Sequence, residues 1–358
     1  MVDDTRRLFI CAAIAIAVSA SPVGAAGSEV FWHGEEGEQS RAAKPRLKKD
    51  GNGDTVPDVR AAAAIIYDPI SGEVIWEENS DVRRSIASLT KLMTVVVFLE
   101  SEHDLSETIT VSRSDVRRAS TTYLRRNERL RVDDLLHLAL VASDNGAARA
   151  LARLSAGGSE RFVERMNEKA VVLGLKSTVF TDPSGLDAGN LSTAYDLSRL
   201  IVYAGGNEKI SRVMRLREHR ITTNRRRVRI RNTNKLLGGE INHRVTRGET
   251  LSVLARRYDT TISAIQSANA LGRRTLIRIG QQLRIPTGNR NVDASSSDVI
   301  VWAGKTGFIR KAGYCLAALL QLPQGKLVAV VVLGARSNAA RFQETRRLIG
   351  WLNMRPAE

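Results

Sequence analysis

The chain has 358 residues, of which 43% are hydrophobic and 26% are charged. This length and composition suffice for one large domain or two smaller ones with proper cores, and they exclude a disordered or fibrous chain. The 54 Lys and Arg residues outnumber the 38 Asp and Glu residues and give a formal net charge of +16. Such a balance favours polyanionic partners, which include nucleic acid, anionic lipid and acidic envelope polymers.

The N-terminus has the pattern of an export signal. Arg6 and Arg7 precede an apolar stretch over 8–18, and small residues follow up to Ala26, so we expect a signal peptide over 1–26. The apolar run is about half of what a membrane span needs, which makes a permanent anchor the weaker alternative. The two arginines fit the general and the twin-arginine export routes. We therefore expect a periplasmic or wall-associated protein without a transmembrane anchor, soluble once the signal is cleaved.

Cysteine and histidine usage gives no sign of a disulfide or a metal site. Cys11 lies in the predicted signal, so Cys315 would remain alone in the mature chain. The five histidines are scattered without the spacing of metal ligands, which argues against zinc. We expect neither a metal nor a cofactor.

Residues 27–58 are predicted to be a linker. They are rich in Gly, Lys, Glu and Asp and show no apolar period. The stretch over 50–54 resembles the start of a calcium loop, but Thr55 and Ala61 stand where such a loop needs its glycine and its bidentate acid. The linker interpretation is therefore preferred.

Beyond the linker, strand patterns stand at both ends of the chain and helical patterns between them. Two apolar runs over 63–67 and 73–76 flank a turn sequence, which indicates a β-hairpin. The further predictions are helices over 88–100, 133–142, 145–154 and 159–172, strands over 314–322 and 326–333, and a last helix over 338–352. This order predicts an α+β core in which the two ends of the chain share one antiparallel sheet.

Residues 242–287 interrupt this pattern with a strand, two helices and a final apolar segment. The stretch RVTRGETLSVLARRYDTTISAIQSANAL, followed by LIRIGQQLRIP, resembles a LysM module. The resemblance implies a β-α-α-β unit that binds the glycan strand of peptidoglycan. A helical hairpin without a ligand is the alternative. Because its terminal strands would lie side by side, the module can be inserted into a loop of a host domain.

Three short motifs indicate the chemistry. An S-x-x-K motif over 88–91 opens the first helix, an S-x-N motif over 143–145 lies between two helices, and a K-T-G motif over 305–307 opens the last group of strands. Each motif is weak alone, since a second S-x-N occurs over 267–269. Together and in this order they are typical of penicillin-binding proteins and class A β-lactamases.

The spacing of the first motif suits nucleophilic catalysis. Residues three apart share one face of a helix, so the Lys91 amine can accept the proton of the Ser88 hydroxyl. Burial and a second cation, for which Lys305 is the candidate, would have to lower the pKa of Lys91. The helix N-terminus offers backbone N–H groups to an oxyanion forming at Ser88. An N-capping Ser88 beside a solvated Lys91 is the alternative.

The flanks of the motifs resemble the serine D-alanyl-D-alanine carboxypeptidases, which are low-molecular-mass penicillin-binding proteins of the peptidase S11 type. The resemblance covers about 61–352 apart from the inserted module, and it rests on SIASLTKLMTVVVFLE, DDLLHLALVASDNGAARALA, TVFTDPSGLDAGNLSTAYDLSRLI, NTNKLL and GKTGFIRKAGYCLAALL. It implies a β-lactamase/transpeptidase-like fold with a helical cluster on a five-stranded antiparallel sheet. The catalytic core would comprise 59–240 and 298–358.

This resemblance implies a role for each motif residue. Ser88 would be the acyl-enzyme nucleophile, Lys91 its base and Ser143 the proton relay to the departing D-alanine. Asn145 would hold the substrate amide. Acylation would be followed by hydrolysis with water, and β-lactams would be covalent inhibitors.

The implied substrate-binding residues continue along the K-T-G strand. Lys305 and Thr306, next to Gly307, would orient the terminal carboxylate of the stem peptide. The backbone N–H of Phe308 would form the oxyanion hole with that of the nucleophile. Arg341 falls where the family places a carboxylate-binding arginine, and an exposed helical arginine is the alternative.

The predicted function is removal of the terminal D-alanine from peptidoglycan stem pentapeptides. A D,D-endopeptidase and a non-catalytic peptidoglycan-binding protein remain open, whereas the Glu-x-x-Leu-Asn motif of a class A β-lactamase does not occur at the expected distance. Ile309 stands where many family members have threonine. Many members also carry a β-rich second domain and a C-terminal membrane helix, and we expect neither after this core. We expect the LysM module to replace such an attachment.

The positive charge is concentrated in two segments. Residues 209–231 contain ten basic and one acidic residue and read as two strand-like arms around a turn at 222–224, and residues 242–287 contain eight basic and two acidic residues. An exported chain rarely meets nucleic acid, so we expect no nucleic-acid partner. The basic face is predicted to meet the acidic wall or an anionic membrane surface.

Overall fold

The computed structural model describes residues 46–237, 239–258, 260–287, 299–322 and 325–355. The predicted signal and the first part of the predicted linker lie outside these residues. Within them, no helix combines the length and the apolar character needed to cross a membrane.

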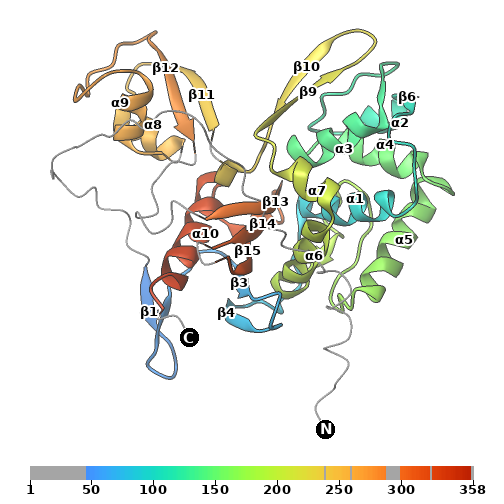
Figure 1. Ribbon diagram of the computed structural model, residues 1–358, viewed down its shortest axis with the longest axis horizontal. Coiled ribbons are helices and arrows are strands. Elements are labelled where there is room, and N and C mark those ends of the chain that lie inside the picture. The colour runs from blue at the N-terminus through green and yellow to red at the C-terminus, as the bar shows by residue number, and fades with distance from the viewer. Residues whose placement is uncertain (1–45, 238, 259, 288–298, 323–324, 356–358) are drawn as a thin grey trace, which may run out of the picture.

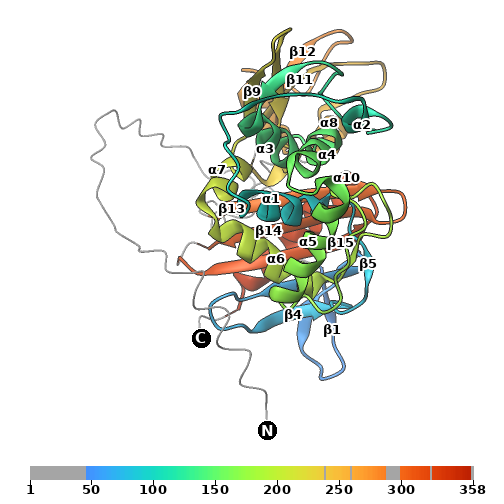
Figure 2. The same ribbon diagram turned by 90° about the vertical axis from the view of Figure 1, so that its right-hand side faces the viewer.

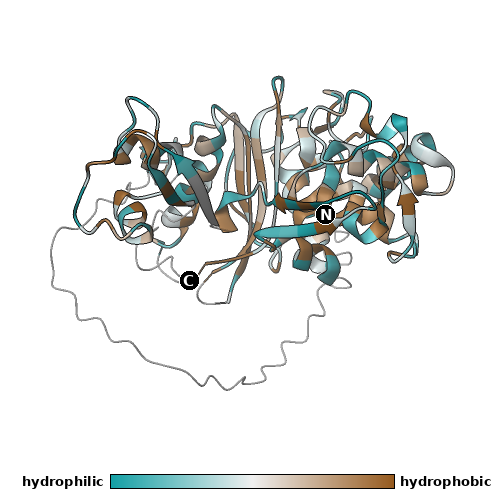
Figure 3. Ribbon diagram, turned by 90° about the horizontal axis from the view of Figure 1, so that it is seen from above, coloured by the Kyte–Doolittle hydropathy of each residue, from teal (hydrophilic) through white to brown (hydrophobic). Residues whose placement is uncertain are grey.

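A five-stranded antiparallel sheet forms the centre of the molecule, with the strand order β13-β14-β15-β3-β4 (Figure 1). Its strands are β3 (Ala63–Tyr67), β4 (Val74–Glu78), β13 (Ile300–Ile309), β14 (Gly313–Gln321) and β15 (Leu327–Ala335). Because β3 pairs with β15, the two ends of the chain complete one sheet, as predicted. The central strands are continuous apolar runs (Figure 3), the pattern expected where both faces of a sheet are covered.

Helices cover both faces. Neighbouring residues Ile65 and Ile66 of β3 belong to different core clusters, since side chains alternate across a sheet. On one face lie α6 (Ala194–Gly206) and the rest of the helical cluster, which faces the viewer in Figure 2. On the other face lies α10 (Asn338–Leu352) (Figure 1). The cluster also contains η2 (Ala87–Thr90), α1 (Lys91–Leu99), α2 (Arg113–Val116), α3 (Val132–Val141), α4 (Asn145–Leu154), α5 (Gly158–Val172) and α7 (Glu208–Met214). The predicted α+β class is confirmed.

Three small ribbons surround this cluster. They are formed by β5 (Arg84–Ser85) with β8 (Leu191–Ser192), β6 (Thr108–Thr110) with β7 (Arg129–Arg131), and β9 (Glu218–Thr222) with β10 (Arg227–Arg231). The last ribbon contains the turn that was predicted at 222–224. The first part of the basic segment forms helix α7 instead of a strand-like arm.

The linker prediction needs a correction over 47–57. These residues form a hairpin of β1 (Leu47–Lys49) and β2 (Thr55–Pro57), closed by a turn in which the Asp50 carboxylate accepts hydrogen bonds from backbone N–H groups. Trp351 of α10 donates to the Thr55 carbonyl at 3.2 Å. The partner that holds the hairpin is far away in the chain, so a local apolar period could not reveal it.

The predicted β-α-α-β unit is also present. Strand β11 (Gly239–Arg244) pairs antiparallel with β12 (Gln282–Thr287), and α8 (Leu251–Arg257) and α9 (Ile262–Ala268) lie between them in the chain. The unit has its own apolar core, which includes Leu254, Ile265 and Ile285. It follows η3 (Lys235–Leu237), and its paired terminal strands allow the chain to return toward β13.

Candidate active site

Ser88 lies in the short turn η2, directly before α1. Lys91 is the first residue of α1, and its Nζ donates to Ser88 Oγ at 2.9 Å, as the three-residue spacing predicts. Ala87 has a φ of 48°, in the left-handed region that non-glycine residues rarely adopt. Two glycines allow the chain to pack closely against this turn. A Cβ on Gly185 would lie 2.0 Å from the Ala87 carbonyl oxygen, and a Cβ on Gly307 would lie 3.2 Å from the Ser88 amide nitrogen.

Lys91 is completely buried, and its amine has two further acceptors. Its Nζ donates to Asn145 Oδ1 and to the Ser184 carbonyl, both at 2.6 Å. Burial lowers the pKa of Lys91 to about 7, against the opposing effect of the Asp144 and Asp182 carboxylates. Burial, not the second cation expected at Lys305, is therefore the main cause. A substantial fraction of Lys91 is neutral at pH 7 and able to accept a proton.

The S-x-N motif stands at the start of α4. Asp144 caps this helix by accepting from the Ala147 N–H at 2.9 Å, and Ser143 before it has a φ of 58°. The Asn145 Nδ2 donates to the Ala119 carbonyl at 2.7 Å, which orients the amide so that its oxygen faces Lys91. The motif thus places Asn145 beside Lys91 and Ser143 beside Lys305, whose Nζ donates to Ser143 Oγ.

Lys305 lies on β13 and is buried as completely as Lys91. Its Nζ donates to Ser143 Oγ at 2.7 Å and to the Thr306 carbonyl at 2.9 Å. Burial lowers the pKa of Lys305 well below its ordinary value, and the charges of Lys91 and Arg341 lower it further. An anionic group next to this amine would favour its protonated form.

Thr306 has a partner that the sequence did not identify as a site residue. Its hydroxyl donates to Thr233 Oγ1 at 2.6 Å, and the Thr233 N–H donates to the Val141 carbonyl at 3.0 Å. Thr233 belongs to the NTNKLL stretch, which suggested the family but gave no role for this residue.

Gly307, Phe308 and Arg341 lie around the end of the same strand. The Phe308 ring is 47% exposed and stacks on Tyr314 with the ring centroids 4.2 Å apart. Arg341 of α10 is buried, which excludes the exposed alternative, and its Nη1 donates to the Gly307 carbonyl at 2.9 Å and the Cys315 carbonyl at 3.1 Å. Burial lowers the pKa of Arg341 to about 10, so it remains charged at neutral pH.

A loop over 182–185 completes the surroundings of Ser88. The Asp182 carboxylate accepts from the backbone N–H groups of Ser184 and Gly185, and this brings the Ser184 carbonyl to Lys91. The stretch TVFTDPSGLDAGNLSTAYDLSRLI suggested the family but gave this loop no role in the site, although its D-P-S-G sequence is a turn signal.

This arrangement can perform acyl transfer. A serine hydroxyl lies beside a lysine that is partly neutral, and a second serine–lysine pair lies next to it. Among the residues with described positions, no three His, Cys, Asp or Glu side chains gather in a way that could hold a metal ion.

The comparisons with known proteins agree with this chemistry. A family model described as D-alanyl-D-alanine carboxypeptidase (peptidase S11) matches residues 50–250, and a LysM domain model matches residues 243–286. The D-alanyl-D-alanine endopeptidase of Haemophilus influenzae is 38% identical over 183 residues, which are 51% of this chain and 63% of that protein. The D-alanyl-D-alanine endopeptidase of Pseudomonas aeruginosa is 29% identical over 347 residues, which are 96% of this chain and 86% of that protein.

A solved structure supports the fold independently. Penicillin-binding protein D2 from Listeria monocytogenes, in its cefotaxime-bound form, superposes with a TM-score of 0.58 and is 26% identical. The superposition covers 82% of this chain and 98% of that chain.

Proposed function

Because the chain belongs to the D-alanyl-D-alanine carboxypeptidase family, peptidase S11, we propose that it removes the terminal D-alanine from peptidoglycan stem pentapeptides through an acyl-enzyme on Ser88. One observation carries this proposal above all. The Nζ of a completely buried lysine, Lys91, lies 2.9 Å from the Ser88 hydroxyl, with its pKa lowered to about 7. A solvated surface lysine would not supply a base at neutral pH.

In the proposed reaction, neutral Lys91 accepts the Ser88 proton while Ser88 Oγ attacks the carbonyl carbon of the last peptide bond. The backbone N–H groups of Ser88 and Phe308 stabilise the oxyanion. The C–N bond then breaks while Ser143 relays the proton held by Lys91 to the departing D-alanine amine, so Lys91 becomes neutral again and Ser143 keeps its hydroxyl. Water hydrolyses the resulting ester and restores the Ser88 hydroxyl.

Substrate recognition in this proposal falls to the K-T-G strand. Lys305 and Thr306 bind the terminal carboxylate, and Asn145 binds the amide of the stem peptide. The carboxylate supplies the negative charge that favours a protonated Lys305. Arg341 stabilises this strand by donating to the Gly307 carbonyl, and its charge adds to the attraction for the carboxylate.

Cleavage of cross-links is the second candidate. The Haemophilus and Pseudomonas relatives are both named endopeptidases, and the second match spans 96% of this chain. An endopeptidase would use the same residues on a cross-linked peptide. Assays of purified monomeric pentapeptides and cross-linked dimers distinguish the two, since a carboxypeptidase releases free D-alanine from the monomer and an endopeptidase converts dimers into monomers.

The proposed organisation is an exported, wall-associated enzyme. Residues 59–240 and 298–358 would form the catalytic core, and residues 242–287 would be an inserted module that binds the glycan strand. The match of the LysM model to residues 243–286 and the separate core of that unit support this division.

Labelling with a fluorescent penicillin tests the proposed function. We expect covalent label on the wild-type chain and none on Ser88→Ala, because the ester to the drug forms on the Ser88 oxygen. The bound cefotaxime in the Listeria protein supports this expectation. An unlabelled wild type, or equal label on Ser88→Ala, would contradict the proposal.

A further inference from the structure

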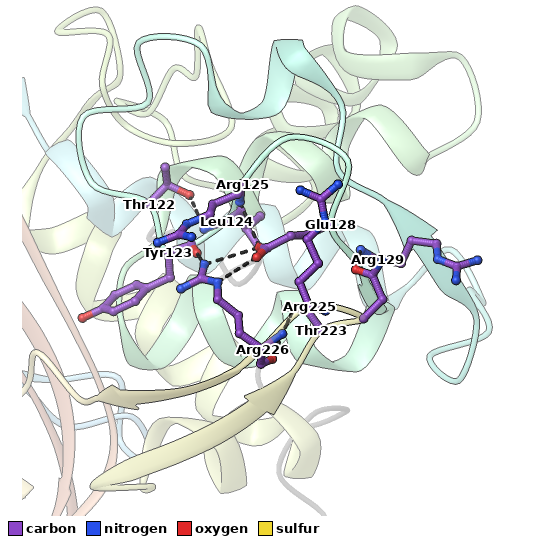
Figure 4. Close-up of polar contacts among 10 residues, drawn as sticks. Thr122, Tyr123, Leu124, Arg125, Glu128, Arg129, Thr223, Arg225 and Arg226 are labelled. Atoms are coloured by element: carbon purple, nitrogen blue, oxygen red, sulfur yellow. Dashed lines mark hydrogen bonds and ion pairs between the residues drawn. The ribbon is translucent and has the colours of Figure 1, made fainter.

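An ion pair between a buried carboxylate and a partly buried arginine joins the β9–β10 hairpin to the segment 117–128 (Figure 4). The Glu128 side chain is completely buried, and its Oε1 accepts from Arg226 Nε at 2.7 Å. Its Oε2 accepts from the Arg125 backbone N–H at 3.1 Å. Burial alone would raise the pKa of Glu128, but these hydrogen bonds hold it below its ordinary value. Glu128 is therefore an ionised, buried group that depends on Arg226.

The same hairpin also contacts the backbone of this segment. Arg226 Nη2 donates to the Tyr123 carbonyl. At the tip of the hairpin, the Asn224 N–H donates to the Arg129 carbonyl at 3.0 Å, and Asn224 Oδ1 accepts from the Arg129 N–H at 2.8 Å. The tip thus docks against 123–129 with paired donors and acceptors.

Segment 117–128 in turn forms hydrogen bonds with the S-x-N motif over 143–145. The Tyr123 N–H and the Thr122 hydroxyl both donate to the Asp144 carboxylate. The Asn145 N–H donates to the Thr121 carbonyl at 3.0 Å, and the Asn145 side chain donates to the Ala119 carbonyl at 2.7 Å.

The segment has little regular structure of its own. It lies between α2 and β7, and Arg118, Ser120 and Asn127 adopt positive φ angles. At its end, the Asn127 N–H donates to the Val111 carbonyl and the Glu128 carbonyl accepts from the Val111 N–H. The rest of this backbone depends on contacts from other segments. The β9–β10 hairpin supplies one such contact, because Arg226 donates to the Tyr123 carbonyl.

We propose that Arg226 and Glu128 are positioning residues for the peptidase: their ion pair fixes segment 117–128, and this segment holds Ser143 and Asn145 against the two lysines. The inference rests on the proposed function. Removing Arg226 leaves a buried carboxylate unpaired, and the segment rearranges to hydrate it. Misplacement of catalytic groups by about 1 Å can slow a reaction by roughly 100-fold.

The hairpin offers a matched control. Arg229 also forms an ion pair with a glutamate, Glu218, but both side chains are well exposed, at 51% and 38%. Arg226→Met and Arg229→Met therefore remove the same charge from the same hairpin, and only the first leaves a buried partner.

The test uses the full chain and measures acylation of Ser88 by a fluorescent penicillin, together with kcat and KM on a soluble pentapeptide. Rates are divided by the concentration of folded protein, measured by circular dichroism. We expect Arg226→Met to lower the acylation rate and kcat by roughly 10- to 100-fold with little change in KM. Arg229→Met should stay within about twofold of the wild type.

A second variant separates positioning from general instability. Adding Glu128→Gln to Arg226→Met removes the unpaired charge and should recover a large part of kcat. Equal rates for Arg226→Met and Arg229→Met, or a loss explained by unfolded protein alone, would overturn the inference. An unlabelled wild type would instead refute the proposed function, and the inference with it.

Discussion

The fold changes the acid–base chemistry of Lys91 through burial. An ordinary lysine has a pKa near roughly 10.4 and is almost entirely protonated at neutral pH. Complete burial favours the neutral amine and brings the pKa of Lys91 to about 7. The Asn145 and Ser184 oxygens bind the amine on two sides and keep it directed at Ser88.

The pH dependence of acylation follows from this pKa. Neutral Lys91 is the reactive form, so the acylation rate constant should rise about tenfold per pH unit below pH 7 and level off above it. Penicillin acylation of the free enzyme, measured from pH 5.5 to 8.5, checks this prediction. A rate that still rises about tenfold between pH 7.5 and 8.5 would show that Lys91 keeps an ordinary pKa.

Thr233 provides a prediction about substrate binding. Its hydroxyl fixes the hydroxyl of Thr306 through the 2.6 Å hydrogen bond. Thr233→Val keeps the shape of the side chain and removes this acceptor. The loss should weaken substrate binding by about 1 kcal/mol, which is roughly fivefold in affinity. We expect a corresponding rise in KM for a pentapeptide. Thr233→Ser, which retains the hydroxyl, should behave like the wild type, and a normal KM for Thr233→Val would refute the role.

At the scale of elements, helix α3 and the β9–β10 hairpin meet through two stacked histidines. The rings of His137 on α3 and His219 on β9 lie 3.9 Å apart at an interplanar angle of 18°. Burial lowers the pKa of His137 below its ordinary value, which favours the neutral ring in the folded protein. The charged and titratable groups around it are Asp133, Asp134, Lys209 and His219.

The sign of the resulting pH effect is fixed by proton linkage. The unfolded chain binds a proton at His137 more readily than the folded chain, so stability falls as the pH drops below about 6.5. His137→Gln removes this titration and should show a smaller loss of Tm between pH 7.5 and 5.5 than the wild type. Thermal unfolding at both pH values checks it, and an equal loss in both proteins would contradict the prediction.

At the scale of the whole molecule, we expect the inserted module to be separable from the rest of the chain. Strands β11 and β12 pair along their full length, so their ends lie close together. A short Gly-Ser link in place of 242–287 should therefore leave the core folded. We expect this variant to cleave a soluble pentapeptide at nearly the wild-type rate and to lose binding to purified sacculi. Unchanged sacculus binding would assign the attachment to another part of the chain.

Some basic residues of 209–231 form ion pairs, whereas others are exposed on the surface. Arg226 and Arg229 are bound in ion pairs with glutamates. Arg220, Arg227 and Arg231 are exposed on the two strands, on the face opposite the buried Val228 and Ile230. A surface that meets an acidic polymer would use these exposed arginines, whereas Arg226 belongs to the internal structure.

The sequence by itself determined the motif residues and much of the order of the elements. Periods of 2 and 3.6 mark strands and helices locally, so strands β3, β4, β14 and β15, helices α1, α3, α4, α5 and α10 and the inserted unit could be predicted. Helices α6 and α7 were not predicted. The motif spacing likewise predicted the contact between Lys91 and Ser88.

Only the tertiary structure decided how these residues are held. Thr233 and Thr306 are 73 positions apart and Glu128 and Arg226 are 98 apart, and no local pattern links such pairs. The hairpin over 47–57 was hidden for the same reason, because Trp351 holds it. Burial also belongs to the fold: a lysine in a motif becomes a base only when distant segments exclude water from it.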